Sequence, residues 1–206
     1  MISAIFQRKI ILSDTDEIWD EVALEDVADG FEYGMNVAAM PYDGLHKYIR
    51  ITDIDENSHK YFGTDPVSPS GNLDDKFRVL PGDILFALTG ASVGKSYLYR
   101  SCDGEMYFAG FLIRIRVKSG YDSEYVFINT LTDNYDKWVM LESARSGQPG
   151  INAEQYRKYR FRLPSLSTQR KISHIISTID NVISKNGEIL VSLQKQKQGL
   201  MQLLFI

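Results

Sequence analysis

A heptad pattern near the C-terminal end constrains the fold of this chain more than any other feature. Between Thr168 and Phe205, positions spaced alternately three and four residues apart are almost all Ile or Leu, which is the a/d pattern of a coiled coil. No Pro interrupts the stretch, so it predicts one long helix with Ser167 or Thr168 as its cap. The a/d seam consists of Ile172, Ile176, Ile179, Ile183, Asn186, Leu190, Leu193, Lys197, Leu200 and Leu204.

This seam favours pairing with a second helix, because a helix of about 35 residues is about 50 Å long and would project beyond a compact domain. Asn186 is typical of a buried polar residue that fixes register and partner number, whereas Gly187 costs about 1 kcal/mol of helix stability. The alternative is an ordinary helix folded back on its own domain. Four further residues widen the apolar stripe: Ile175, Val182, Ile189 and Leu203.

The composition is that of a globular protein. The chain has 206 residues, of which 44% are hydrophobic and 12% aromatic, enough for one packed domain before the helix. It shows no signal-peptide pattern and no apolar run of membrane-spanning length, so we expect a cytoplasmic protein without membrane contact. The single Cys102 and three scattered His residues predict neither an internal disulfide nor a metal site.

The charge is unevenly distributed. The net charge of −4 argues against nucleic acid as a partner, but residues 142–171 hold seven Lys and Arg against two Asp and Glu. Such a local basic face can bind phosphate on an acidic protein, because screening limits exposed charges to about 8–10 Å. A merely solvated surface is an equally good interpretation of this feature alone.

We predict an α/β (α+β) domain over residues 1–165 and the coiled-coil helix over residues 166–206, with the boundary at Pro164 and Ser165. A short strand leading into a short helix is expected between residues 19 and 27. The other expected strands are 4–11, 48–54, 84–88, 97–99, 106–117 and 159–163, and the other expected helices are 123–142 and 152–156. Three basic residues alternate with apolar ones in one strand and predict a wet, positive face there: Arg114, Arg116 and Lys118.

The loop from Thr89 to Ser96 ends in Gly-Lys-Ser, as a phosphate-binding loop does. Such a loop needs four residues between its glycines and a helix after it, whereas Gly90 and Gly94 are separated by three residues and a β-like stretch follows. Nucleotide binding is therefore not expected, and the loop is predicted to turn tightly and present Ser92, Lys95 and Ser96 outward. No Asp-Pro-Pro-Tyr or Asn-Pro-Pro-Tyr element for amino methylation is present.

Several stretches together resemble the DNA-specificity subunits of type I restriction–modification systems. They are Trp19 with the apolar residues after it, YIRITDI from Tyr48, LPGDILFALTGASVGKS from Leu80, and SGQPGINAEQYRKYRFRLPSLSTQRKI from Ser146 to Ile172, followed by the long helix. Thr168 stands where the family usually has Glu. Family members typically carry two target-recognition domains and two long helices, so this chain is similar to half of one.

The resemblance implies a target-recognition domain that reads one half of a bipartite site in double-stranded DNA, and a helix that acts as a ruler and as a docking surface for the methylation subunit and possibly the restriction subunit. It implies no catalysis and no cofactor bound by this chain; the assembled complex would use S-adenosylmethionine, and ATP with Mg for restriction. Two copies paired antiparallel through the helix, as a homodimer, would place their domains about 50 Å apart, on the order of 15 base pairs.

We expect DNA contacts from the two Gly-containing loops, because Lys and Arg suit phosphates while Arg, Gln and Asn can pair with base edges. A Lys95 substitution should then weaken binding to all sequences and flatten its salt dependence. The alternative is a coiled-coil dimeric scaffold that binds only protein partners; a nuclease or ATPase is a distant third. The candidate DNA-binding residues are Ser92, Lys95, Ser96, Arg145, Ser146, Gln148, Asn152 and Lys60.

Overall fold

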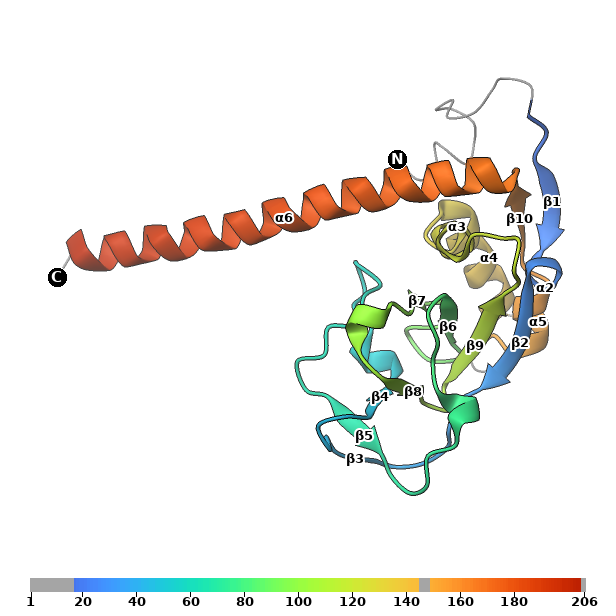
Figure 1. The fold of residues 1–206 in the computed structure, drawn as a ribbon, viewed down its shortest axis with the longest axis horizontal. Helices are drawn as coiled ribbons and strands as arrows, with labels where there is room; N and C mark the ends of the chain where they lie inside the picture. Colours follow the sequence, from blue (N-terminus) through green and yellow to red (C-terminus); the bar gives the residue numbers. More distant parts are fainter. Residues whose placement is uncertain (1–16, 145–148, 205–206) are drawn as a thin grey trace.

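The chain forms a domain of strands and short helices from which one long helix projects (Figure 1). The computed structural model describes residues 17–144 and 149–204. This mixed α/β architecture with a long C-terminal helix is the one predicted, whereas the strand expected within residues 4–11 lies outside the described residues. No helix in the described part of the chain is long and apolar enough to cross a membrane.

The strands and helices have the following bounds. The strands are β1 (Asp20–Ala23), β2 (Ala28–Tyr33), β3 (Ala39–Pro41), β4 (Lys47–Ile49), β5 (Val67–Pro69), β6 (Asp83–Ala87), β7 (Ser96–Leu98), β8 (Met106–Phe108), β9 (Leu112–Val117) and β10 (Arg160–Leu163). The helices are α2 (Leu24–Val27), α3 (Ser123–Asn129), α4 (Asp133–Ser143), α5 (Ala153–Arg157) and α6 (Leu166–Leu204), with 3₁₀ turns η1 (Ile51–Asp53), η2 (Asp75–Phe77) and η3 (Ser101–Asp103).

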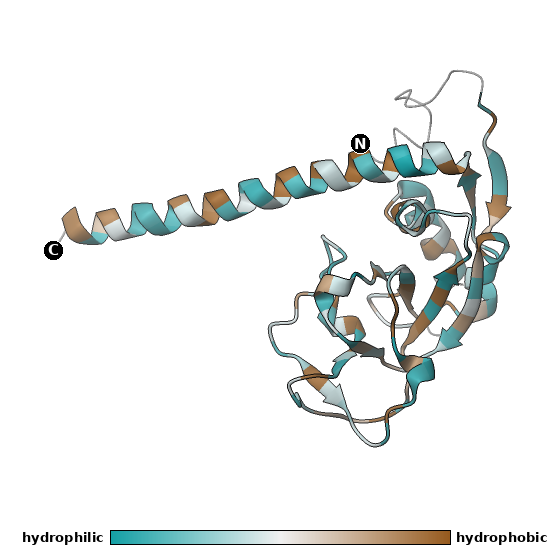
Figure 2. Cartoon of the chain, viewed as in Figure 1, coloured by the Kyte–Doolittle hydropathy of each residue, from teal (hydrophilic) through white to brown (hydrophobic). Residues whose placement is uncertain are grey.

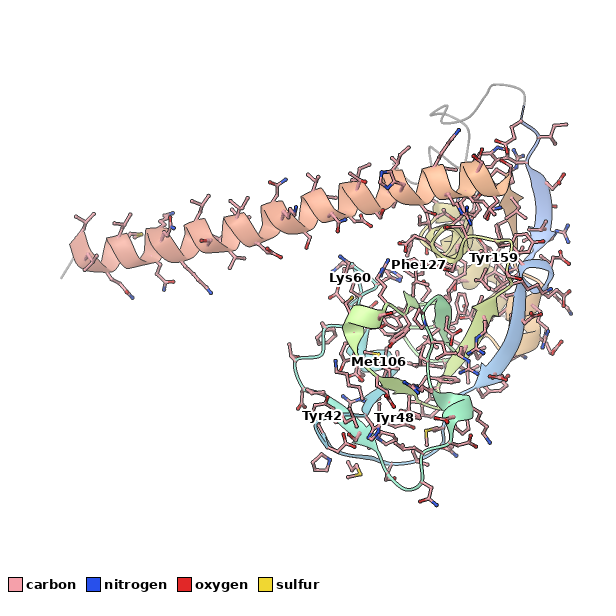
Figure 3. The ribbon with its side chains drawn as sticks, viewed as in Figure 1. Tyr42, Tyr48, Lys60, Met106, Phe127 and Tyr159 are labelled. Carbon is pink, nitrogen blue, oxygen red and sulfur yellow. The ribbon has the colours of Figure 1, made fainter. Side chains whose placement is uncertain are left out.

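An antiparallel sheet in the order β2-β9-β6-β7 lies at the centre of the domain and is covered on both faces. Ile84 and Phe86 of β6 pack with residues of α3, α4 and α5, whereas Leu85 and Ala87 pack with β4 and β8. In Figure 3, Phe127 and Tyr159 lie on the helical side, and Met106 lies on the other. A strand that is buried on both faces has no polar alternation, which is why β6 was recognisable as a continuous apolar run.

The predicted wet and positive face of β9 is wrong for Arg114. Its side chain points to the side of the sheet that packs with β4 and β8 and is only 7% exposed. There it forms an ion pair with Glu32 and donates to the Arg78 carbonyl. The neighbouring Arg116 makes a two-pronged pair with the buried Asp83, at 2.9 and 3.1 Å. A buried cation such as Arg114 needs such partners, so it joins strands and does not present charge to a ligand. Arg116 is 49% exposed and pairs with Asp83 from the solvent side.

Two other predicted elements are shorter in the structure than expected, because side chains bond to the nearby backbone. The expected strand 48–54 is strand only to Ile49, since Asp53 accepts from the Arg50 N–H at 2.8 Å and closes the turn η1. The expected helix 123–142 is broken into α3 and α4, and Thr132 caps the second at the Tyr135 N–H. Such local bonds compete with regular structure.

The long helix α6 is anchored at its start and free beyond. Its cap is Ser165, whose Oγ accepts from the Thr168 N–H at 3.4 Å, and not Ser167 or Thr168 as predicted. Gln169 is 2% exposed, accepts from the Asp122 N–H at 3.0 Å and donates to the Pro164 carbonyl at 2.8 Å. From Asn181 to Leu204 nearly every residue is exposed, although Figure 2 shows apolar residues all along this part. The helix is therefore not folded back on its own domain.

Candidate nucleic-acid interface

Two loops that are far apart in the sequence lie side by side at the end of β6. The Thr89 hydroxyl donates to the Pro149 carbonyl at 3.2 Å, and the Gly90 N–H reaches the same oxygen at 3.4 Å. The Ile151 N–H donates to the Leu88 carbonyl at 2.9 Å. These bonds make the Gly-containing loop after β6 and the loop before α5 one continuous surface, and both carry predicted DNA-binding residues.

The loop after β6 is held in shape by two buried tyrosines. The Tyr135 hydroxyl donates to the Gly94 carbonyl at 2.7 Å, and the Tyr156 hydroxyl donates to the Ala87 carbonyl at 2.9 Å. Burial raises the pKa of both hydroxyls, so they remain donors at neutral pH. Gly94 has a φ of +85°, and a side chain there would also meet Val139. The backbone of this loop is therefore fixed before any ligand arrives.

The outward presentation predicted for Lys95 and Ser96 is wrong. The Lys95 side chain is 6% exposed, and its ammonium group donates to the Ile54 carbonyl at 3.1 Å and pairs with Glu56 at 2.7 Å. This bond lowers the pKa of Glu56. Ser96 is fully buried and shares a 2.6 Å hydrogen bond with Thr130. Both side chains bind the protein's own groups, and only Ser92 of the three is partly exposed.

The candidates in the loop before α5 divide between those that the structure describes and those that it does not. Asn152 caps α5, because its side-chain oxygen accepts from the Gln155 N–H at 3.0 Å. The side-chain oxygen of Gln155 in turn accepts from the Asn152 N–H. This reciprocal arrangement matches the short capped helix predicted from the sequence. Arg145, Ser146 and Gln148 lie outside the described residues, so their predicted role stays a prediction.

Although the ring of the adjacent His59 bonds to the Ser96 carbonyl at 2.9 Å, Lys60 itself lines a separate cleft. Figure 3 shows Lys60 at the side of the domain that faces α6. With Tyr61, Arg100 and Cys102 it lines a cleft of about 350 Å³ whose opposite wall is formed by Ser177, Asp180 and Asn181 of α6. The cleft also contains Asp103 and Glu124, so its charge is mixed.

The basic segment 142–171 is only partly available to a ligand. Arg157 stacks on the Phe31 ring at 4.4 Å and pairs with Glu154, and Arg160 pairs with Glu21. Exposed Arg162 and Lys158 have no ion pair with any residue that the structure describes. Arg162 lines a cleft of about 340 Å³ with Asn134 of α4. Arg162 and Lys158 are therefore available for phosphate contacts, as are the exposed Arg170 and Lys171 in the first turns of α6.

Phe111 is a candidate that the sequence did not reveal. It lies in the turn between β8 and β9, its side chain is 62% exposed, and its carbonyl accepts from the Leu88 N–H at 3.0 Å. The turn is thus attached to the loop after β6, and an aromatic ring stands beside the paired loops. A lone Phe between Gly110 and the apolar Leu112 looks like part of a buried strand, so no local pattern indicates its exposure.

Among the described residues, no three His, Cys, Asp or Glu side chains form a group that could hold a metal ion.

Comparison with known proteins identifies relatives across nearly the whole described chain. Residues 17–195 match the family described as Type I restriction modification DNA specificity domain. A putative type I restriction enzyme MjaX specificity subunit from Methanocaldococcus jannaschii is 23% identical over 209 residues, which cover 96% of this chain and 48% of that protein. The chain therefore spans about half the length of this curated relative.

Solved structures share the fold. A chain from a structure of complex assembly and conformational transition in the type I R-M system has a TM-score of 0.63 at 15% identity, over 97% of this chain and 49% of that one. The HsdS subunit from Thermoanaerobacter tengcongensis has a TM-score of 0.60 at 15% identity, over 89% of this chain and 43% of its own.

Proposed function

This chain belongs to the type I restriction modification DNA specificity family, and from that premise we propose that it reads one half of a bipartite site in double-stranded DNA. It positions the methylation and restriction subunits on that site. Its own role is binding and not catalysis, so S-adenosylmethionine, ATP and Mg belong to the partner subunits. The observation that carries the proposal is the match of residues 17–195 to the DNA specificity family, together with a single domain at one end of a helix whose apolar seam is exposed.

The surface that we assign to DNA consists of the two paired loops and the turn that carries Phe111. Thr89, Ser92 and the loop 145–148 would supply polar groups for base edges or phosphates. The exposed ring of Phe111 would contact a base or sugar, because aromatic faces stack on bases of any sequence. We assign Lys95 and Ser96 to holding the loop from inside, because their side chains bond to the Ile54 carbonyl and to Thr130.

The long helix supplies the geometry. Thirty-nine residues correspond to about 58 Å, and pairing of α6 between two copies would place two recognition domains on one DNA molecule. Two identical domains related by two-fold symmetry would read a site with the same symmetry. A methylation subunit would dock on the outer faces of the paired helices, as the resemblance to the specificity subunits implies.

Selection of DNA from a random library by the purified full chain tests this function. We expect enrichment of two symmetric half-sites separated by an unread spacer, with an affinity that falls steeply as salt rises. The alternative is a dimeric scaffold for protein partners, which the exposed seam alone would also fit. A chain that sediments as a dimer but retains no DNA at low salt, with or without its methylation subunit, would favour that scaffold.

A further inference from the structure

The exposed part of the α6 seam begins where the domain stops covering it. Ile172 and Ile176 are at most 2% exposed against the domain, whereas Ile183, Leu190, Leu193, Leu200 and Leu204 are each more than half exposed. Figure 2 shows apolar bands along this part of α6, which has no neighbour over this length. A soluble helix with such a stripe needs a partner.

The order of apolar and polar positions along this seam is the same in both directions. From Ile179 to Leu204 it runs apolar, apolar, Asn186, apolar, apolar, Lys197, apolar, apolar. A pattern that is unchanged on reversal is complementary to itself when two copies run antiparallel. It is not complementary to itself when they run parallel, because each Lys197 would then face its own counterpart.

From this pattern we infer that α6 pairs with α6 of a second copy, antiparallel, in the register where Asn186 faces Lys197 of the partner subunit. The amide oxygen of Asn186 accepts from that ammonium group, so the two polar residues of the seam satisfy each other. Every other layer is then apolar. The layers are Ile179 with Leu204, Ile183 with Leu200, and Leu190 with Leu193, each formed twice by symmetry. This inference rests on the proposed pairing of two copies and specifies its geometry.

The neighbouring registers are worse by the same chemistry. A shift of one heptad in one direction places Lys197 of the partner subunit against Ile179, and a shift in the other places it against Leu193. Each shift also places Asn186 against a Leu. An ammonium or amide group buried against apolar side chains loses its water without gaining a partner. Only the central register avoids this at both polar positions.

The residues beside the seam agree with this register. In antiparallel coiled coils the flanking positions face their own kind, so Val182 faces Leu203 of the partner subunit and Ile189 faces Gln196 of the partner subunit. Val182, Ile189 and Leu203 are 53%, 56% and 77% exposed in the single chain. The pairing therefore covers the widened part of the apolar stripe as well as the seam.

The register fixes the distance between the two domains. It places the two copies of Ile176, where each helix leaves its domain, about 31 residues apart along the shared axis, which is about 46 Å or about 14 base pairs. A shift of one heptad would change this distance by about 10 Å, or about three base pairs. The end of the partner helix also arrives beside Ile179 and Asp180, at the cleft that Lys60 and Cys102 line. This gives that cleft an occupant other than DNA.

Cysteine cross-linking of the full chain tests the register directly. In a Cys102→Ser background, we expect Asn186→Cys mixed with Lys197→Cys to form a disulfide-linked dimer, and neither variant to do so alone. The two copies of residue 186 would lie about 16 Å apart, beyond the reach of a disulfide. Efficient cross-linking of Asn186→Cys with itself would overturn the antiparallel register.

Charge substitution gives a second readout by sedimentation equilibrium. Asn186→Asp should tighten the dimer, because each new carboxylate faces Lys197 of the partner subunit. Asn186→Lys should raise the dimer dissociation constant at least about tenfold, and adding Lys197→Asp should reverse this. A dimer weakened by Asn186→Asp would indicate a parallel pair and overturn the inference. A monomer at all concentrations would refute the proposed pairing itself, whereas a dimer with the wrong cross-links refutes only the register.

Discussion

Substitution of Lys95 tests whether this residue supports the recognition loop from inside or contacts DNA. Its ammonium group donates to the Ile54 carbonyl at 3.1 Å and pairs with Glu56 at 2.7 Å, and its side chain is 6% exposed. We predict that Lys95→Met lowers the free energy of unfolding while leaving the salt dependence of DNA binding unchanged. This outcome is the opposite of the one that the sequence alone indicated.

The expected magnitudes follow from the exposure of the two partners. A hydrogen bond from a charged donor to a buried carbonyl contributes about 1.5–3 kcal/mol. The pair with Glu56 contributes about 0–1 kcal/mol, because that carboxylate is 69% exposed and screened by water. Lys95→Met keeps the aliphatic stem and should therefore cost about 2–3 kcal/mol, Lys95→Ala somewhat more, and Glu56→Gln less than about 1 kcal/mol.

Urea unfolding of the three variants measures stability, and titration with a selected DNA site at several salt concentrations measures the contact. A phosphate contact contributes about 0.9 to the slope of log K against log salt. We expect no change in this slope for Lys95→Met. The matched control is Lys158→Ala, which removes the cation of an exposed Lys and not that of a buried one. A slope reduced by about 0.9 with unchanged stability would show that Lys95 reaches a phosphate, and the reasoning from burial would fail.

Three further predictions concern the domain and its junction with the helix. Gly34→Ala should destabilise the fold by at least about 2 kcal/mol in urea, since a Cβ there would lie 2.2 Å from the Ala109 carbonyl oxygen; Gly187→Ala, which meets nothing within 4 Å, should stabilise α6 by up to about 1 kcal/mol and is the control. Gln169→Ala removes two buried hydrogen bonds, so hydrogen exchange in the first turns of α6 should quicken and stability fall by about 2 kcal/mol. Burial raises the hydroxyl pKa of Tyr97 and other tyrosines, so stability should be full below about pH 10 and fall as the pH rises above it, as urea midpoints between about pH 9 and about pH 12 would show.

The sequence predicted those elements whose signal is local and periodic. The α6 helix, the strand β6 and the capped helix α5 lie where the patterns placed them. The wrong predictions for Lys95 and Arg114 concern interactions between distant residues. Nothing near Lys95 in the sequence indicates that the Ile54 carbonyl would receive its ammonium group, and nothing near Arg114 points to Glu32.

The candidate site shows the same division. The sequence identified both loops as candidates, but their adjacency depends on the bonds between Thr89 and Pro149, which no local pattern encodes. Phe111 was missed because exposure of a single apolar residue is decided by the turn in which it lies. The break at Thr132 could have been predicted, since a Thr that caps a following helix is a recognisable signal.

The attachment of α6 to the domain determines how accurately a distant point can be held. The helix is about 58 Å long, and its direction is fixed by a few contacts in its first turns, among them the bonds of Gln169 and the bond from Ser173 to Asp122. A tilt of about 5° at this joint displaces the far end by about 5 Å, more than the 3.4 Å rise of one base pair. Angular stiffness in these first turns therefore limits how strictly the length of an unread DNA segment can be enforced.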